Sequence, residues 1–206
     1  MNYLAIDTSG KSLSIVLCKN DQIYTTFLSD CGVRHSTSLM PEIEKLIEKT
    51  DFDLKKVDFF CAVVGAGSFT GIRIGVSTIK AFCLAFNKPC LSVTSFDTIA
   101  YNKKDGKNLA VIDAKHNGYY VCGYNGNVVI KEPSYIDKET LIKLSKQYNL
   151  LSFEPLSVDV AVNCEKVDIL QGLINAVEDK KNNLLLDANL LTPLYVRKSQ
   201  AEEGRP

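Results

Sequence analysis

Three glycines and two hydroxyl residues crowd into one short run of this sequence, and their types and spacing suit the binding of an anion. Gly65, Gly67 and Gly71 allow positive φ angles and close approach of a ligand or a neighbouring chain, while Ser68 and Thr70 can cap a following helix. A glycine loop between a strand and a helix N-terminus presents unpaired N–H groups and the positive end of the helix dipole. Phosphate binding is the chemistry that this arrangement favours. The loop alone leaves an equal alternative, a tight strand-to-helix crossover that holds no ligand.

The run matches neither of the two common nucleotide-binding fingerprints. Its spacing is not G-x-G-x-x-G, and no lysine follows the glycines as G-x-x-x-x-G-K-[ST] requires. The segment G-S-F-T-G is not a nucleophile elbow either, because no base stands near its serine. The sequence therefore gives no support to an autonomous hydrolase.

The histidines and cysteines form no recognisable metal-binding pattern. His35 and His116 are the two histidines, and they stand far apart in the chain, so local helix geometry cannot bring them onto one metal ion. We expect His35 to be a capping or interface residue and His116 to lie in an exposed turn. The seven cysteines contain no C-x-x-C pair, which predicts reduced, buried thiols. No metal and no cofactor is expected.

Composition bounds the class of protein. Lys plus Arg and Asp plus Glu both total 24, so the overall charge draws the chain neither to nucleic acid nor to an anionic membrane. The N-terminus runs from Met1 directly into an alternating strand pattern, without the basic and apolar regions of a signal peptide, so we do not expect secretion. No apolar stretch approaches the roughly 20 residues of a membrane span. We expect a cytoplasmic protein without membrane contact.

Strands and helices alternate in the first half of the chain. A turn at Asn20-Asp21 separates two predicted strands. Apolar residues recur at helical spacing at Leu39, Ile43, Leu46 and Ile47. The predicted strands cover about 3–7, 12–19, 22–28, 59–64 and 89–94, and the predicted helices cover about 35–50, 73–86 and 95–101.

A polar, lysine-rich break at 102–108 is the predicted domain boundary. It divides the chain into residues 1–102, with the glycine loop and its flanking helices, and a smaller domain of residues 103–206. We also consider that the last residues pack back on the first domain. The second half has predicted strands at 109–113, 119–124 and 127–130, followed by predicted helices at about 138–147 and 167–178.

The helix after the glycine loop has two apolar faces where one would cover a sheet. One face is made of Ile72, Val76, Ile79, Cys83 and Phe86. The other is smaller and smoother, and comprises Ile74, Ser77, Thr78, Ala81 and Ala85. The second face needs a second covering, for which the helix at 39–47 and another protein chain are equal alternatives.

Four motifs together resemble one family, the TsaB (YeaZ) family of threonylcarbamoyladenosine biosynthesis on tRNA. They are Leu4-Ala5-Ile6-Asp7-Thr8-Ser9, Arg34-His35-Ser36, the run from Gly65 to Gly75, and Pro193-Leu194-Tyr195-Val196-Arg197. The resemblance spans nearly the whole chain, and the glycine-loop motif is its most specific part. The sequence departs from the family at Ala66, where proline is usual.

This resemblance implies an α/β protein with the actin-like, sugar kinase and Hsp70-related (ribonuclease H-like) fold, in two subdomains with mixed sheets, the second reduced. It also implies a non-catalytic role. Family members bind the catalytic protein TsaD through helices of the first subdomain, TsaE joins the larger complex, and self-association uses a similar surface. TsaD transfers the threonylcarbamoyl group to adenosine next to the anticodon of tRNA, so this chain is expected to meet tRNA only indirectly.

In the related ATP-binding fold, an acidic residue at the end of the first strand, followed by small hydroxyls, faces phosphate and magnesium. Here a recognisable adenosine loop is missing, because only Gly172 and Gly204 follow Asn127. A vestigial phosphate site is therefore preferred to a working ATPase, and Asp7 could simply cap its own turn. The residues of this predicted vestigial site are Asp7, Thr8, Ser9, Gly65, Gly67, Ser68 and Gly71.

The sequence thus predicts a scaffold that stabilises and activates TsaD through a helix–helix interface. The predicted interface residues are His35, Leu39, Ile43, Ile47, Arg73, Ile74, Ser77, Thr78, Ala81 and Ala85. One alternative is a free-standing ATP-dependent enzyme or a TsaD-like metallopeptidase of the same fold. Another is a module that recruits tRNA, although the balanced charge and the lack of an aromatic and basic pattern count against it.

Overall fold

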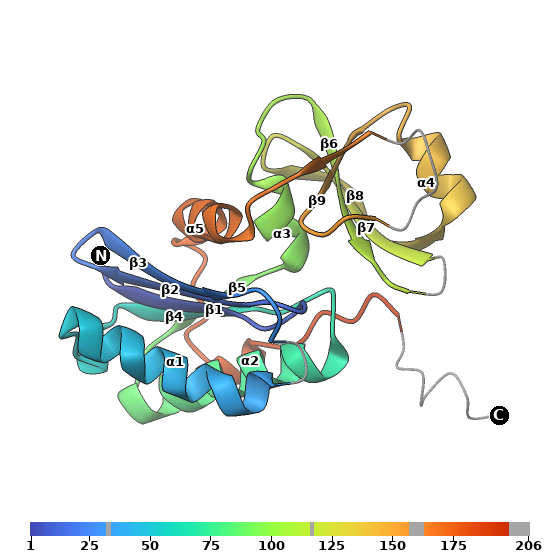
Figure 1. Cartoon of the computed structure of the whole chain (residues 1–206). Helices are drawn as coiled ribbons and strands as arrows, with labels where there is room; N and C mark the ends of the chain where they lie inside the picture. The colour runs from blue at the N-terminus through green and yellow to red at the C-terminus, as the bar shows by residue number, and fades with distance from the viewer. Residues whose placement is uncertain (32–33, 116–117, 157–162, 198–206) are drawn as a thin grey trace. The chain divides into compact units, whose positions relative to one another are not determined.

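Two mixed β-sheets organise the chain, and each belongs to its own unit of the structure (Figure 1). The structure is a computed structural model that describes residues 1–31, 34–115, 118–156 and 163–197. Among the described residues, the first unit comprises Met1–Ser95 and Ala176–Leu194, and the second comprises those of Phe96–Asn175 together with 195–197. The predicted α/β class, with a mixed sheet in each half, is confirmed.

The first sheet has the order β3-β2-β1-β4-β5. Its first three strands are antiparallel neighbours, and β4 and β5 add to β1 in parallel. Asn20 and Asp21 join β2 to β3 with φ angles of 51° and 65°, as the tight turn of a two-residue hairpin requires. The bounds are β1 Tyr3–Asp7, β2 Leu13–Lys19, β3 Gln22–Leu28, β4 Phe59–Val63 and β5 Cys90–Val93.

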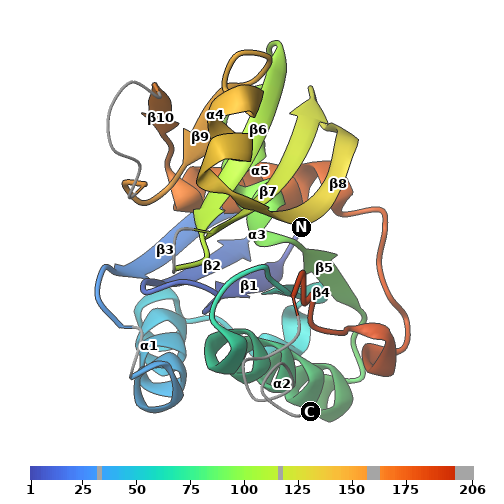
Figure 2. The ribbon, with the colours of Figure 1, turned by 90° about the vertical axis from the view of Figure 1, so that its right-hand side faces the viewer.

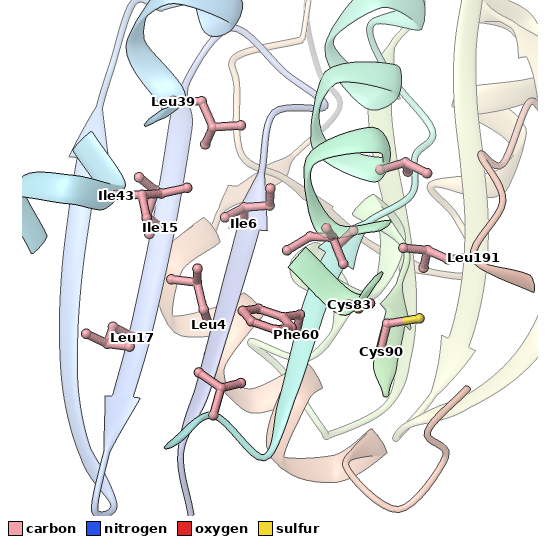
Figure 3. Close-up of a cluster of buried hydrophobic side chains, with 14 of the residues drawn as sticks. Leu4, Ile6, Ile15, Leu17, Leu39, Ile43, Phe60, Cys83, Cys90 and Leu191 are labelled. Carbon is pink, nitrogen blue, oxygen red and sulfur yellow. The ribbon is translucent and has the colours of Figure 1, made fainter. Parts of the chain in front are cut away.

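Two helices, α1 (His35–Thr50) and α2 (Phe69–Phe86), cover one face of this sheet (Figure 1). Strand side chains alternate between faces, so Leu4 and Ile6 point to the same side and meet the helices there. Figure 3 shows this core, in which α1 supplies Leu39 and Ile43. The short helices α3 (Ser95–Ala100), η1 (Leu54–Lys56) and η2 (Ala188–Leu190) lie in the connections.

The C-terminal end of α1 is held by a lysine from the sheet. The Lys19 ammonium donates to the carbonyl of Thr50 at 2.6 Å and to that of Asp51 at 3.2 Å. A positive charge at a helix C-terminus satisfies carbonyls that have no partner within the helix and interacts favourably with the helix dipole. This contact fixes the position of α1 against β2.

Residues 185–194, called the strap below, run beside α2 in the opposite direction. Leu185 exchanges backbone hydrogen bonds with Cys90, at 2.7 and 3.0 Å, next to the end of α2. The Lys80 ammonium donates to the carbonyl of Asn189 at 3.4 Å, and the amide of Leu194 donates to the carbonyl of Val64 at 2.7 Å, next to the start of α2. Figure 2 shows α2 between α1 and η2, the central part of the strap. The strap therefore closes the side of the helical layer that α1 leaves open.

The second sheet has the order β10-β9-β6-β7-β8 around a smaller core. Helix α4 packs on β7 and β8, and helix α5 begins in the second unit and ends in the first. The bounds are β6 Lys107–Asp113, β7 Gly118–Asn125, β8 Val128–Asp137, α4 Lys138–Leu144, β9 Asn149–Ser152, β10 Cys164–Lys166 and α5 Ile169–Lys180.

Most predicted elements are confirmed, with three informative differences. Helix α2 begins at Phe69 rather than at 73, because the Ser68 hydroxyl accepts from the amide of Gly71 at 3.2 Å and starts the helix there. Strand β8 runs on to Asp137, beyond the predicted 130. Strands β9 and β10 were not predicted, since four and three residues are too short for a periodic signal.

The division between the units falls after Ser95, where the sequence predicts 102/103. The lysine-rich run is a folded turn, because the Asn108 side chain donates to the carbonyls of Lys103 and Asp105. Just before it, α3 packs closely on α5: a Cβ added at Gly172 would stand 1.7 Å from the carbonyl oxygen of Thr98. Both features keep 96–108 in the second unit.

Candidate functional site

The end of β1 forms a buried turn around Asp7. Its Oδ1 accepts from the amide of Ser9 at 2.8 Å and from the hydroxyl of Ser9 at 2.6 Å, and the Ser95 hydroxyl donates to Ser9 Oγ at 2.9 Å. Burial raises the pKa of Asp7 above its ordinary value of 3.8, although the bonds from Ser9 and the charge of nearby His35 oppose this shift. Asp7 therefore caps its own turn, the simpler of its two predicted roles.

The glycines of the loop stand against the chain's own backbone. A Cβ added at Gly67 would meet the carbonyl oxygen of Ser9 at 2.2 Å, and one at Gly71 would meet that of Thr8 at 2.0 Å. At Gly65, where φ is +116°, an added Cβ would meet the carbonyl oxygen of Leu194 at 2.7 Å. Each of these glycines is required because a neighbouring strand end or the strap passes too close for any side chain.

Amides at the start of α2 are also occupied. The amide of Ser68 donates to the carbonyl of Ser9 at 2.6 Å, that of Gly71 donates to Ser68 Oγ, and that of Ile72 donates to the carbonyl of Ser68. A phosphate cradle needs such amides free to point at the ligand. These three amides are not available to a phosphate, so the geometry favours the crossover interpretation of the loop.

His35 contributes to no metal centre in the described part of the chain. His35 is 1% exposed, and its Nε2 lies 3.0 Å from the carbonyl oxygen of Gly10, so it joins α1 to the loop after β1 instead of facing a partner. His116 lies outside the described residues. Within the ranges that the structure describes, no cluster of three or more His, Cys, Asp or Glu residues could hold a metal ion, and all seven cysteines are free thiols.

The outer face of α2 carries the smooth stripe that the sequence predicts. Ser77, Ala81 and Ala85 are exposed, and Ile74 and Thr78 are half-buried. The inner face, from Ile72 to Cys83, lies in the core on the sheet. Arg73 is exposed, and its guanidinium carbon stands 3.9 Å from the centre of the Phe69 ring. By length and composition α2 is the one helix of the described chain that could cross a membrane, a property shared by core helices of soluble proteins.

The α1 residues predicted for the same surface divide into two groups. Leu39 and Ile43 are each 1% exposed and pack against the sheet, so they stabilise the unit itself and offer no area to a partner. Ile47 is half-buried and borders the core. Helical periodicity places Leu39, Ile43 and Ile47 on one stripe, but it does not say whether a sheet or a partner covers that stripe.

Three exposed leucines were missed by the sequence reasoning. Leu84 at the end of α2 is 75% exposed, and Leu186 and Leu190 of the strap are 88% and 62% exposed. For Leu186 and Leu190 the only sequence signal was that leucines recur in an otherwise polar stretch after α5. That stretch has neither a helical nor a strand period, so it did not predict which leucines are exposed.

Comparison with known proteins shows similarity to proteins named for the modification of tRNA. The model of the family described as "TsaD: tRNA N6-adenosine threonylcarbamoyltransferase" matches residues 29–173. A Bacillus subtilis protein named "tRNA threonylcarbamoyladenosine biosynthesis protein TsaB" is 31% identical over 126 residues, which are 60% of this chain and 55% of that protein. A Buchnera aphidicola protein of the same name is 26% identical over 190 residues, which are 89% of this chain and 82% of that protein.

A solved structure shares the fold along almost the whole chain. YeaZ from Pseudomonas aeruginosa superposes with a TM-score of 0.74 at 18% identity, covering 94% of this chain and 99% of that one. The resemblance to TsaB and YeaZ and the actin-like fold class are thereby confirmed. The match to the Bacillus subtilis relative spans little more than half of that protein's length.

Proposed function

From the premise that this chain belongs to the family described as TsaD, tRNA N6-adenosine threonylcarbamoyltransferase, we propose that it acts in threonylcarbamoyladenosine biosynthesis as the TsaB-like accessory subunit. In this role it is a non-catalytic scaffold. It binds a TsaD subunit, stabilises it and activates it, and the TsaD subunit transfers the threonylcarbamoyl group to the adenosine next to the anticodon of tRNA.

The outer face of α2 is the observation that carries this proposal. Its side chains are small or aliphatic, and Ser77, Ala81 and Ala85 remain exposed although the opposite face of the same helix is in the core. Small side chains let a second helix approach closely. The proposed surface comprises Ile47, Arg73, Ile74, Ser77, Thr78, Ala81 and Ala85, without His35, Leu39 and Ile43, whose side chains are buried.

A non-catalytic role is supported by the loop at the start of α2. In the fold class of this chain that loop is where a phosphate would bind, but here its glycines contact the backbone of Thr8, Ser9 and Leu194, and the amides of Ser68, Gly71 and Ile72 are hydrogen-bonded. The carboxylate of Asp7 is engaged twice by Ser9 and buried. These contacts serve folding, and they support a vestigial site more than an ATP-dependent enzyme.

The partners follow from this role. TsaD forms a heterodimer with the chain, TsaE joins the larger complex, and a homodimer uses the same surface when TsaD is absent. The tRNA is reached only through TsaD. We expect the complex to be cytoplasmic. In it the sheet covers one side of α2 and the partner covers the other, so α2 does not enter a membrane.

Reconstitution tests this function directly. Threonylcarbamoyl transfer is measured with purified TsaC, TsaD, TsaE, ATP, threonine, bicarbonate and tRNA, with this chain added or omitted. We expect modified tRNA to accumulate only when the chain is present, and the chain alone to turn over no ATP. Full transfer without the chain, or ATP turnover by the chain alone, would contradict the proposal.

A further inference from the structure

Every third residue of the strap turns toward the core. Leu185 packs on the core of the first unit, and Ala188 and Leu191 are part of it, 8% and 0% exposed. These inward residues force Leu186 and Leu190 to the outside, where they are 88% and 62% exposed. An irregular surface segment would ordinarily place polar residues at such positions, so two outward leucines on an anchored segment need an explanation.

The strap leucines stand beside the outer face of α2. Lys80 and Leu84 are four residues apart and therefore share one side of that helix. Lys80 reaches across to the carbonyl of Asn189, the neighbour of Leu190, at 3.4 Å. Leu84, 75% exposed, follows one turn later toward the end of α2, where Leu185 pairs with Cys90. Two elements far apart in the sequence, α2 and η2, thus lie side by side (Figure 2), and the exposed Leu84, Leu186 and Leu190 belong to α2 and to the strap that contains η2.

Most side chains of the proposed α2 surface are small, so by itself it offers a partner little apolar area. A stable interface buries about 800 Å² on each partner. Serine, threonine and alanine side chains permit close helix approach but add little to that area. Full burial of a leucine side chain is worth about 1.5–3 kcal/mol, and three exposed leucines lie next to the stripe. They supply what the stripe lacks.

We propose that Leu84, Leu186 and Leu190 form the anchor that determines the affinity of this chain for its catalytic subunit. This inference rests on the function proposed above and deepens it. The stripe on α2 sets how closely the partner's helices approach, and the leucine anchor supplies most of the apolar burial. The occupant is an apolar helical face of the TsaD subunit that extends past α2 onto the strap.

Binding to purified TsaD, measured by titration calorimetry with the full chain, tests this anchor. The variants are Leu84→Ala, Leu186→Ala and Leu190→Ala. The matched control is Val128→Ala, which removes an apolar side chain that is 67% exposed on β8, in the other unit. Each leucine variant is expected to raise the Kd about 10-fold to 100-fold, and the control to leave it unchanged.

Thermal melts separate binding from folding. Exposed side chains contribute little to stability, so all four variants should have the same melting temperature as the wild type. Leu190 lies in η2, so Leu190→Ala could lower the melting temperature by disturbing η2. In that case the Kd of Leu186→Ala, which lies before η2, is compared with that of the control.

Each further outcome has a defined meaning. Unchanged Kd for all three leucine variants, while Ala81→Glu still weakens binding, would overturn the anchor and leave the proposed function standing. Loss of self-association without any loss of TsaD binding would also overturn it, since the occupant would then be a second copy. Failure of the wild-type chain to bind TsaD at all would overturn both proposals.

Discussion

The hydroxyl of Thr8 donates to the carbonyl of Gly71 at 2.7 Å and joins the end of β1 to the first turn of α2. The backbone makes the same junction from the other side, because the amide of Ser68 donates to the carbonyl of Ser9. The glycine run is thus a packing joint that sets the direction of α2. Since α2 carries the proposed partner surface, the joint positions that surface.

Replacing Gly71 by alanine should destabilise the first unit. The new Cβ would stand 2.0 Å from the carbonyl oxygen of Thr8, a backbone atom that cannot move alone. We expect Gly71→Ala to lower the free energy of unfolding by about 1–3 kcal/mol, despite the better helix propensity of alanine. Urea denaturation measures the change.

Gly10→Ala is the matched control, because an added Cβ at Gly10 meets nothing within 4 Å. We expect its unfolding midpoint to stay within error of the wild type. Equal stability of Gly71→Ala and Gly10→Ala would show that the loop can accommodate a side chain at position 71. Packing against the backbone would then not explain the glycines, and ligand binding would be the remaining explanation.

The buried carboxyl of Asp7 should make stability depend on pH. Its pKa is raised by burial in the folded state, so between the unfolded value, 3.8 in ordinary surroundings, and the folded value the native protein binds more protons. Stability is then highest below the unfolded pKa and falls as pH rises through the folded pKa. Asp7→Asn keeps the acceptor for Ser9 but cannot ionise.

We therefore expect the unfolding free energy of Asp7→Asn to decline less than that of the wild type as pH rises above about 4, the ordinary pKa of aspartate. Urea titrations at a series of pH values measure the difference. Parallel pH profiles for the two proteins would indicate that the Asp7 carboxyl titrates as freely in the folded chain as in the unfolded one.

Truncation of Ile43 should cost stability, because this residue lies between α1 and the sheet. It is 1% exposed, and replacement of a buried isoleucine by alanine typically lowers the free energy of unfolding by about 2–5 kcal/mol. Met40→Ala, on the same helix but 41% exposed, should change it by less than about 0.5 kcal/mol.

Thermal and urea unfolding of the two variants decide the role of the α1 stripe. A stable Ile43→Ala protein that loses only its affinity for TsaD would return Ile43 to the partner surface.

Local patterns in the sequence predicted the elements well. Asn20-Asp21 predicted its hairpin because few residues tolerate positive φ, and the spacing of Leu39, Ile43 and Ile47 predicted α1 because it matches a helical turn. These signals are local, so they could not say what covers a helix face. Leu39 and Ile43 of α1 pack against the sheet, whereas Ala81 of α2 is exposed. In the sequence all three were predicted to lie on the partner surface.

Long-range contacts account for what the sequence did not predict. The strap has no period of its own, and its course is set by Cys90, Lys80 and Val64, which contact it from across the fold. The glycine loop illustrates the same limit. Its composition allows close approach of a ligand or a neighbouring chain, but only the fold identifies the approaching atoms as the chain's own carbonyls.

The most direct test of the account is the affinity of the Ala81→Glu variant for TsaD. Ala81 is exposed in the middle of the proposed surface, so a glutamate there leaves the free chain folded but places an unpaired charge in the complex. Gln147→Glu adds the same charge at an exposed position after α4 in the other unit. We predict a loss of at least about 2 kcal/mol of binding free energy for Ala81→Glu and none for Gln147→Glu. Undiminished affinity of a folded Ala81→Glu protein would contradict the central claim that α2 is the partner helix.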